Sequence, residues 1–137
     1  MTDLLLEMNN IKIEGCSNGQ WKPIIKSVDL RLKRGEILGL IGESGAGKST
    51  LGLAAMGYTK VGCRISGGSI QFDGMELTGA SHEALRNLRG KRIAYVAQSA
   101  AAAFNPAFKL ITQYCEAPVQ HGVMTQDQAQ SDAIDLY

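Results

Sequence analysis

The stretch that decides the fold of this chain is a glycine-rich segment, Gly42-Glu43-Ser44-Gly45-Ala46-Gly47-Lys48-Ser49-Thr50. It matches the pattern Gly-x-x-x-x-Gly-Lys-(Ser/Thr), in which a glycine-rich loop leads into a helix. A continuous apolar run, residues 37–41, precedes this phosphate loop, and residues 49–56 have a helical composition. Such an apolar run is typical of a strand that is buried on both faces. The order of strand, loop and helix therefore predicts an α/β fold.

The residue types in the phosphate loop suit the binding of a nucleoside triphosphate. Backbone N–H groups of such a loop point into a concavity and bind phosphate oxygens, helped by the positive end of the helix dipole. The glycines permit the strained backbone because they lack a Cβ. Lys48 can place its ammonium on the β- and γ-phosphates, Ser49 can ligate Mg²⁺, and Thr50 can reach the α-phosphate. The plain alternative is a glycine-rich turn that carries an exposed lysine.

Composition limits the class of protein. The chain has 137 residues, of which 45% are apolar and 20% charged, and its formal net charge is +1. These values fit one ordinary globular domain without the basic surface that nucleic-acid binding needs. No apolar stretch approaches the ~20 residues of a membrane-spanning helix. The 3 cysteines are widely spaced and form no zinc motif. We expect no nucleic-acid partner, no direct membrane insertion and a reduced cytoplasmic setting.

Hydrophobic periodicity predicts strands on both sides of the phosphate loop. They are expected at residues 4–14, 27–33, 69–74 and 92–97, and a loop is expected at residues 15–23. The second of these strands would end at a turn over the next three residues, before the apolar run.

Helices are predicted by capping residues and by apolar spacing. Ser81 is the expected N-cap of a helix that ends near Gly90. Two further helices are expected between residues 108 and 137, divided near residues 121–122, with Thr125 as the cap of the second.

With these elements in order, the chain resembles the ATP-binding subunits of ABC transporters. Residues 42–50 are similar to the Walker A loop of that family, and residues 95–98 resemble the strand that ends in its Q-loop glutamine, here Gln98. Residues 104–106 read Phe-Asn-Pro and are similar to the Leu-Asn-Pro of the dipeptide and oligopeptide importer branch.

The resemblance implies an incomplete ABC nucleotide-binding domain. Its fold class would be α/β: a P-loop NTPase core of the RecA-like type, an antiparallel β subdomain and the start of the helical subdomain. Residues 1–137 would be the N-terminal half, with the β subdomain and the core through the Q-loop in residues 1–98 and the helical start in residues 99–137. The implied cofactors are ATP and Mg²⁺. Ser49 and Gln98 would hold the Mg²⁺, and Gln98 would also sense the attacking water.

The resemblance also implies partners. In the family, transmembrane permease subunits and a second ATPase subunit complete the machine, which would place this chain on the inner face of the cell membrane. The residues after Gln98 would face the permease. Ser99 and Ala100 stand there where Asp-Pro is common in the family.

Two residues are candidates for the contact with the adenine base. The family stacks an aromatic side chain on the adenine, upstream of the first Walker A glycine. Cys16 stands near that position, and Trp21 follows five residues later in the expected loop. Either residue is a candidate, with Trp21 favoured slightly over the alternative that its ring only packs under the loop.

One motif is rejected and several are missing. Residues 65–68 read Ile-Ser-Gly-Gly and resemble part of the family signature Leu-Ser-Gly-Gly-Gln. They precede Gln98, however, so we interpret them as a turn that enters a strand. After Gln98 we find no signature, no apolar strand ending in Asp-Glu and no switch histidine. Without a strand beside them, residues 37–41 would expose an apolar edge.

Three functions remain open at this point. The first is the ATP-binding part of an ABC importer ATPase that powers the uptake of peptides or similar small solutes. The second is a truncated, catalytically inactive nucleotide-binding fragment, because hydrolysis needs groups that are missing here. Whether the chain is an enzyme is thus left undecided. The third is another P-loop enzyme such as a kinase, against which Gln98 and residues 105–106 argue.

Overall fold

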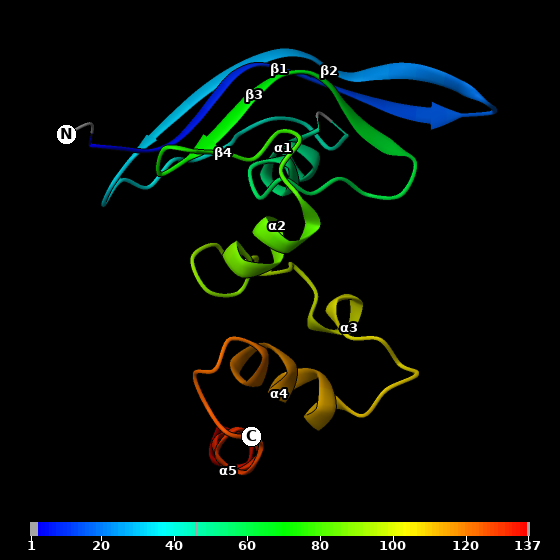
Figure 1. The fold of residues 1–137 in the computed structure, drawn as a ribbon. Coiled ribbons are helices and arrows are strands. Elements are labelled where there is room, and N and C mark those ends of the chain that lie inside the picture. Colours follow the sequence, from blue (N-terminus) through cyan, green and yellow to red (C-terminus); the bar gives the residue numbers. More distant parts are fainter. Residues whose placement is uncertain (1–2, 46, 137) are drawn as a thin grey trace. The chain divides into compact units, whose positions relative to one another are not determined.

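The structure is a computed structural model that describes residues 3–45 and 47–136. The chain forms two compact units, Met1–Leu85 and Arg86–Tyr137. The elements follow one another as in Figure 1: β1 (Leu4–Ser17), β2 (Gln20–Lys33), α1 (Lys48–Ala54), β3 (Cys63–Phe72), β4 (Met75–Glu76), α2 (His82–Leu88), α3 (Ala100–Ala103), α4 (Leu110–Gln120) and α5 (Gln126–Leu136). Ala46 of the phosphate loop lies outside the described residues. The subdomain boundary expected after residue 98 stays a prediction.

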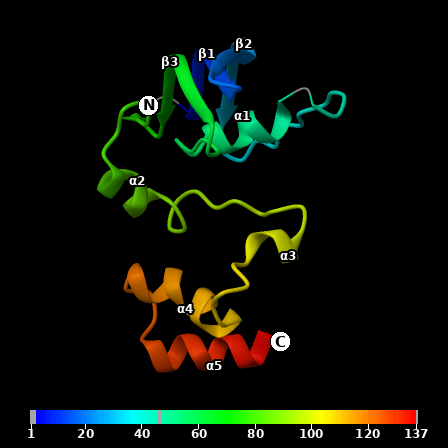
Figure 2. The same ribbon diagram turned by 90° about the vertical axis from the view of Figure 1, so that its right-hand side faces the viewer.

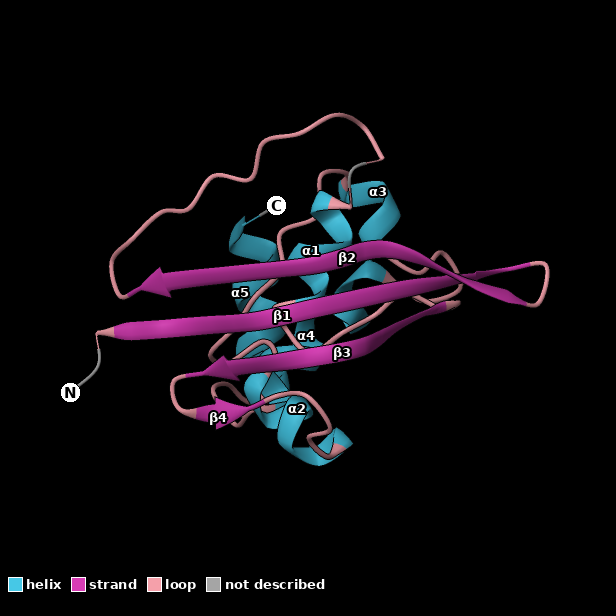
Figure 3. Ribbon diagram, turned by 90° about the horizontal axis from the view of Figure 1, so that it is seen from above, coloured by secondary structure: helices cyan, strands magenta, loops and turns pink. Residues whose placement is uncertain are grey.

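The first unit is built on an antiparallel sheet in the order β2-β1-β3-β4 (Figure 3). The predicted strands at 4–14 and 27–33 are confirmed as parts of longer strands, and the strand predicted at 69–74 is the end of β3, followed by a turn at residues 73–74. The loop expected at residues 15–23 is wrong, because β1 and β2 continue to a tight hairpin turn. Asn18 and Gly19 form that turn with φ of 52° and 75°. An Asn-Gly pair with positive φ at both residues matches the twist of a two-residue hairpin.

The core of this unit lies on one face of the sheet. Buried residues recur along β1, one of the two inner strands, and define the buried face of the sheet. Figure 1 shows α1 beneath this face. Leu51 and Ala54 of α1 are both buried. Their spacing, i and i+3, puts them on the same face of the helix. The largest fully buried aliphatic side chains of the sheet are Met8, Ile11, Ile13 and Ile70.

A bulge interrupts the pairing of β1 and β3. The register between these strands shifts between Asn9 and Lys12, where Asn10 has a φ of 48°. Gly68 faces this bulge with a φ of +90°, and a Cβ built on it would lie 2.4 Å from the backbone oxygen of Asn10. Residues 65–68 therefore lie inside β3, so the turn predicted there is wrong, and glycine is needed at position 68 for backbone clearance.

The apolar run at residues 37–41 does not form the predicted buried strand. It is an irregular segment that leads from β2 toward α1 (Figure 3), and Ile37 and Ile41 are 97% and 100% exposed. A central strand needs hydrogen-bonding neighbours, and no strand in the described ranges pairs with this segment. The strand prediction is wrong, whereas the expected exposure of this apolar edge is confirmed.

The strand predicted at residues 92–97 is also absent. One isolated parallel bridge joins Arg89 and Ile93, and the following residues are irregular. Val96 is 91% exposed. As with residues 37–41, the composition of residues 92–97 predicts a strand, but no strand of the described residues pairs with them.

The predicted helices are confirmed, and side-chain caps explain where α2 and α5 begin. Ser81 Oγ accepts the N–H of Ala84 at 3.2 Å, directly before α2. Thr125 and Gln128 form a reciprocal capping box before α5: Gln128 N–H donates to Thr125 Oγ1 at 3.3 Å, and Thr125 N–H donates to Gln128 Oε1 at 2.9 Å. Figure 2 shows α4 and α5 packed side by side. The short helix α3 was not expected.

Candidate nucleotide-binding site

The phosphate loop lies between the irregular segment and α1. Gly45 and Gly47 both have a φ of +86°, in the left-handed region that disfavours residues with a Cβ. Gly47 is the N-cap of α1, and its carbonyl oxygen accepts the N–H of Leu51 at 2.8 Å. Ser49 and Thr50 belong to the first turn of the helix. The local path from loop to helix is therefore the one that the sequence pattern predicts.

Lys48 folds back over the loop. Its Nζ donates hydrogen bonds to the backbone oxygens of Gly42 at 2.5 Å and Glu43 at 2.6 Å. The ammonium is thus held at the start of the loop by two neutral acceptors, and no carboxylate contacts it in the described residues. A cation fixed by neutral carbonyls keeps its charge available to an anion that enters the loop.

The loop is anchored to the sheet through β2. A Cβ built on Gly47 would lie 3.3 Å from Cγ1 of Ile25 and 3.5 Å from Cγ2 of Ile24. The glycine thus lets the loop backbone pack directly on these two isoleucines. Ile25 is buried and pairs with Ile13 of β1, so the phosphate loop lies on the core face of the sheet.

Trp21 and Cys16, the two candidates for the adenine, are partners across the hairpin. Trp21 is thus a strand residue, not a loop residue. The guanidinium carbon of Arg64 lies 4.0 Å from the centre of the Trp21 ring, and the same guanidinium group is paired with Glu14 at 2.9 Å. This stacked pair could not be predicted from the sequence, because β3 joins the hairpin only in the folded sheet.

The stacked pair identifies the face of the sheet on which the Trp21 ring lies. Arg64 pairs with Glu14 in the β1–β3 register, next to the pair of Ile65 with the fully buried Ile13. Because neighbouring strand residues point to opposite faces, Glu14 and Arg64 lie on the outer face. The Trp21 ring that contacts Arg64 lies there too, whereas the phosphate loop packs on the inner face.

Gln98 belongs to the second unit. It is exposed and directly precedes Ser99, the N-cap residue of α3. The neighbouring segment is shaped by Gln113 of α4, whose amide nitrogen donates to the backbone oxygens of Asn105 at 2.9 Å and Phe108 at 3.0 Å, and whose Oε1 accepts the N–H of Asn105 at 2.8 Å. The Asn-Pro segment is therefore fastened to α4 by one side chain.

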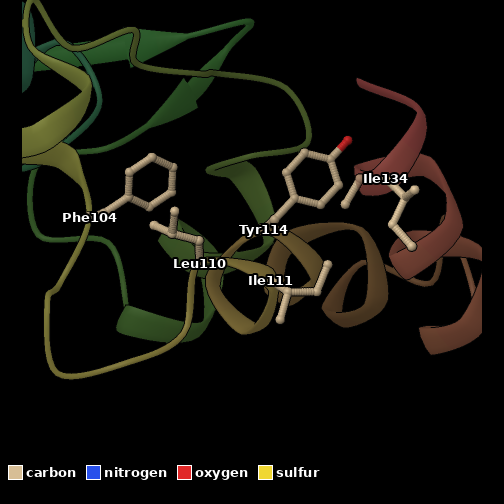
Figure 4. Close-up of a pocket in the computed structure, with 6 residues that line it drawn as sticks. Phe104, Leu110, Ile111, Tyr114 and Ile134 are labelled. Carbon is tan, nitrogen blue, oxygen red and sulfur yellow. The ribbon is translucent and has the colours of Figure 1, made fainter. Parts of the chain in front are cut away.

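The second unit also holds an apolar pocket of about 330 Å³ (Figure 4). Its lining comes from α4, α5 and the residue that follows α3: Phe104, Leu110, Ile111, Tyr114, Ala133 and Ile134. This lining suits an apolar group and offers nothing that would bind phosphate.

In residues 3–45 and 47–136, no helix is both long and apolar enough to cross a membrane. The same ranges hold no group of three or more His, Cys, Asp or Glu side chains that could bind a metal ion.

Comparison with known proteins identifies the class. A model of the ABC transporter family matches residues 25–135 of this sequence, so the chain belongs to that family. The ATP-binding cassette MJ0796, solved as a dimer in a post-hydrolysis state bound to ADP and Pi, aligns with a TM-score of 0.76 at 19% identity. The alignment covers 96% of this chain and 55% of that one. The predicted fold class, an incomplete ABC nucleotide-binding domain, is confirmed.

Curated relatives narrow the branch. The chain is 33% identical to the oligopeptide transport ATP-binding protein OppD of Lactococcus lactis subsp. cremoris and covers 39% of its length. It is 34% identical to AmiE of Streptococcus pneumoniae, covering 38%, and 31% identical to AppD of Bacillus subtilis, covering 40%. Both are also oligopeptide transport ATP-binding proteins. These alignments include 96–97% of this chain, which thus spans about two-fifths of the length of these relatives.

Proposed function

We propose that this chain provides the phosphate- and nucleotide-binding part of a peptide-type ABC importer ATPase. The observation that carries the proposal is the geometry of Lys48, whose ammonium is held over a glycine loop with left-handed backbone at the entrance to α1. Such a loop binds phosphate oxygens through its N–H groups and one lysine. The similarity to oligopeptide transport ATP-binding proteins supports the choice of branch.

The roles of the individual residues follow from this proposal. Residues 42–50 enclose the phosphates of ATP, and Lys48 neutralises the charge of the β- and γ-phosphates. Ser49 would hold Mg²⁺, which would supply positive charge for the terminal phosphate, and the role of Gln98 as a further ligand stays a prediction. A hydroxyl and an amide oxygen are hard donors of the kind that Mg²⁺ takes. The assignment of Trp21 or Cys16 to the adenine stays a prediction.

The assembly and its place are part of the same proposal. We infer that a second ATPase subunit and transmembrane permease subunits work with this chain on the inner face of the cell membrane. The solved neighbour with ADP and Pi is described as a dimer, which supports the inference of a second subunit. Peptides or similar small solutes are the proposed cargo, because the relatives are oligopeptide transport ATP-binding proteins.

The chain by itself is proposed to bind ATP without turning it over. Hydrolysis needs an acidic group for the metal and a group that orients water, and the sequence contains no Asp-Glu after an apolar strand. Calorimetry with ATP and Mg²⁺ tests binding, and phosphate release tests turnover. Binding without phosphate release is expected. Failure of ATP to bind would contradict the proposed site. Robust phosphate release would contradict the proposal that the chain binds ATP without hydrolysing it.

A further inference from the structure

The turn that joins β1 to β2 carries the one asparagine of this sequence that a glycine follows, Asn18-Gly19. Ser17 pairs with Gln20 across the turn, so Asn18 and Gly19 are its two central residues. Both are exposed. The pairing of β1 with β3 ends at Gly15, and the turn therefore projects past β3 at one end of the sheet (Figure 3).

The two groups that can react with each other at this turn are both accessible. A Cβ built on Gly19 would meet no atom within 4 Å. In residues 3–45 and 47–136, no hydrogen bond engages the side chain of Asn18 or the N–H of Gly19. A bond between the Gly19 nitrogen and the side-chain amide carbon of Asn18 closes a succinimide ring, because only the Cβ, Cα and carbonyl carbon of Asn18 lie between them.

Asn10 offers a comparison within the same sheet. Its backbone is also left-handed, with a φ of 48° against 52° for Asn18. The side-chain oxygen of Asn10, however, accepts the hydroxyl of Ser27 at 2.7 Å. The residue after Asn10 is Ile11, which is fully buried and branched at Cβ, so its nitrogen is crowded. Gly19 has no Cβ and can adopt whatever backbone conformation ring closure requires.

We propose that Asn18 is a site of spontaneous deamidation, with water as the only co-reactant. The peptide between Asn18 and Gly19 rotates out of the turn, for which only the end of the hairpin must open. The Gly19 nitrogen then forms a bond to Cγ of Asn18, and the side-chain nitrogen leaves as ammonia with the former Gly19 amide proton. Water opens the succinimide at either carbonyl, which gives aspartate or isoaspartate. Both products carry a new carboxylate, which lowers the formal net charge of +1 by one unit.

The test follows deamidation of the full 137-residue chain during incubation in mildly alkaline buffer. Trypsin releases residues 13–26, in which Asn18 is the single asparagine, and residues 1–12, which contain Asn10. Mass spectrometry with fragmentation locates the change, and a zero-time sample corrects for deamidation during digestion. Asn18 should convert about tenfold faster than Asn10 or more, into two separable products of equal mass. Gly19→Ala should slow the conversion about tenfold, because the new Cβ crowds the attacking nitrogen.

Three other outcomes would overturn the inference. Equal conversion of Asn18 and Asn10 would mean that the exposed glycine turn has no special reactivity. Conversion of Asn18 only in urea would mean that the folded turn protects its side chain. Aspartate as the sole product, formed at the same rate in Gly19→Ala, would mean direct hydrolysis without a succinimide. The comparison of Asn18 with Asn10 needs no variant, so it remains decisive if circular dichroism shows that Gly19→Ala does not fold.

Discussion

Lys48 donates a hydrogen bond from its Nζ to the backbone oxygen of Gly42, six residues earlier, and so spans the loop in which both residues lie. Six residues of extended chain would separate the two groups by about 20 Å. The contact therefore requires the loop to turn back on itself, as the two left-handed glycines allow. The same closure places the ammonium beside the backbone oxygens of Gly42 and Glu43, at the start of the loop.

Replacement of Lys48 by alanine should lower the affinity for ATP about 10- to 100-fold, because a charge-assisted hydrogen bond contributes about 1.5–3 kcal/mol. The measurement is a calorimetric titration with ATP and Mg²⁺. Lys26→Ala removes an exposed lysine from β2 and is the matched control, which should bind as the wild type does. Tight ATP binding by Lys48→Ala would mean that the site lies elsewhere.

Gly68→Ala should destabilise the first unit by about 3 kcal/mol. The new Cβ would meet two backbone oxygens, those of Asn9 and Asn10, at 2.5 and 2.4 Å, and the φ of +90° disfavours alanine as well. Urea unfolding followed by the fluorescence of Trp21, the single tryptophan, reports on this unit.

Gly67→Ala is the neighbouring control for that variant. Its Cβ would meet only the flexible Lys12 side chain, at 3.3 Å, so a loss below about 1 kcal/mol is expected. Similar losses for the two variants would show that the bulge imposes no backbone clearance at Gly68.

Removal of the Tyr114 hydroxyl should loosen the pair of helices in the second unit. Tyr114 of α4 donates to Asp132 Oδ2 of α5 at 2.5 Å in a partly buried setting. Tyr114→Phe should lower the free energy of unfolding by about 1–2 kcal/mol, measured from the helical circular dichroism signal. Tyr95→Phe changes a half-exposed tyrosine and should have no effect. An unchanged midpoint for Tyr114→Phe would show that this hydrogen bond adds no net stability.

Glu76 should make the β3–β4 hairpin sensitive to acid. Burial raises the pKa of its carboxyl group, but hydrogen bonds from the Thr78 side chain, the N–H groups of Ile70 and Thr78, and Gln71 outweigh this effect. The pKa in the folded chain is therefore below the usual 4.5. The unfolded state then binds a proton more readily, so this stabilisation is complete above pH 4.5 and is lost as the pH falls through the folded pKa.

The test of this pH dependence is the unfolding free energy between neutral pH and pH 3 for the wild type and Glu76→Gln. The wild type should lose more stability in that window than the variant, whose amide cannot titrate. Glu116→Gln alters an exposed glutamate of α4 and should follow the wild type. Parallel curves for all three proteins would refute the assigned role of Glu76.

Ile37→Lys should leave the stability of the first unit within about 0.5 kcal/mol of the wild type, because Ile37 is 97% exposed. The same change should reduce self-association measured by light scattering, since it removes apolar surface from water contact. Ile11→Lys, at a fully buried position, should unfold the unit. A large loss of stability in Ile37→Lys would instead support the buried strand that the sequence predicts.

Local features of the chain were predictable because the residues that cause them are close in the sequence. The phosphate loop depends on glycines within nine positions, and the caps at Ser81 and Thr125 depend on side chains three residues from their partners. Gln98, by contrast, was assigned by resemblance alone, and its role stays a prediction. The family assignment needed only the order of residues 42–50, 95–98 and 104–106, and comparison with known proteins confirmed it.

The sequence by itself determined the glycine loop, the helices other than α3 and the family. Only the tertiary structure decided which apolar runs become strands and which face carries each side chain. Residues 37–41 have the composition of a buried strand, but hydrogen bonds from other segments make a strand, and none of the described segments supplies them. Likewise Trp21 and Ile24 are near neighbours in sequence. A single bulged residue and the pairing of β1 with β3 direct one toward Arg64 and the other toward the phosphate loop.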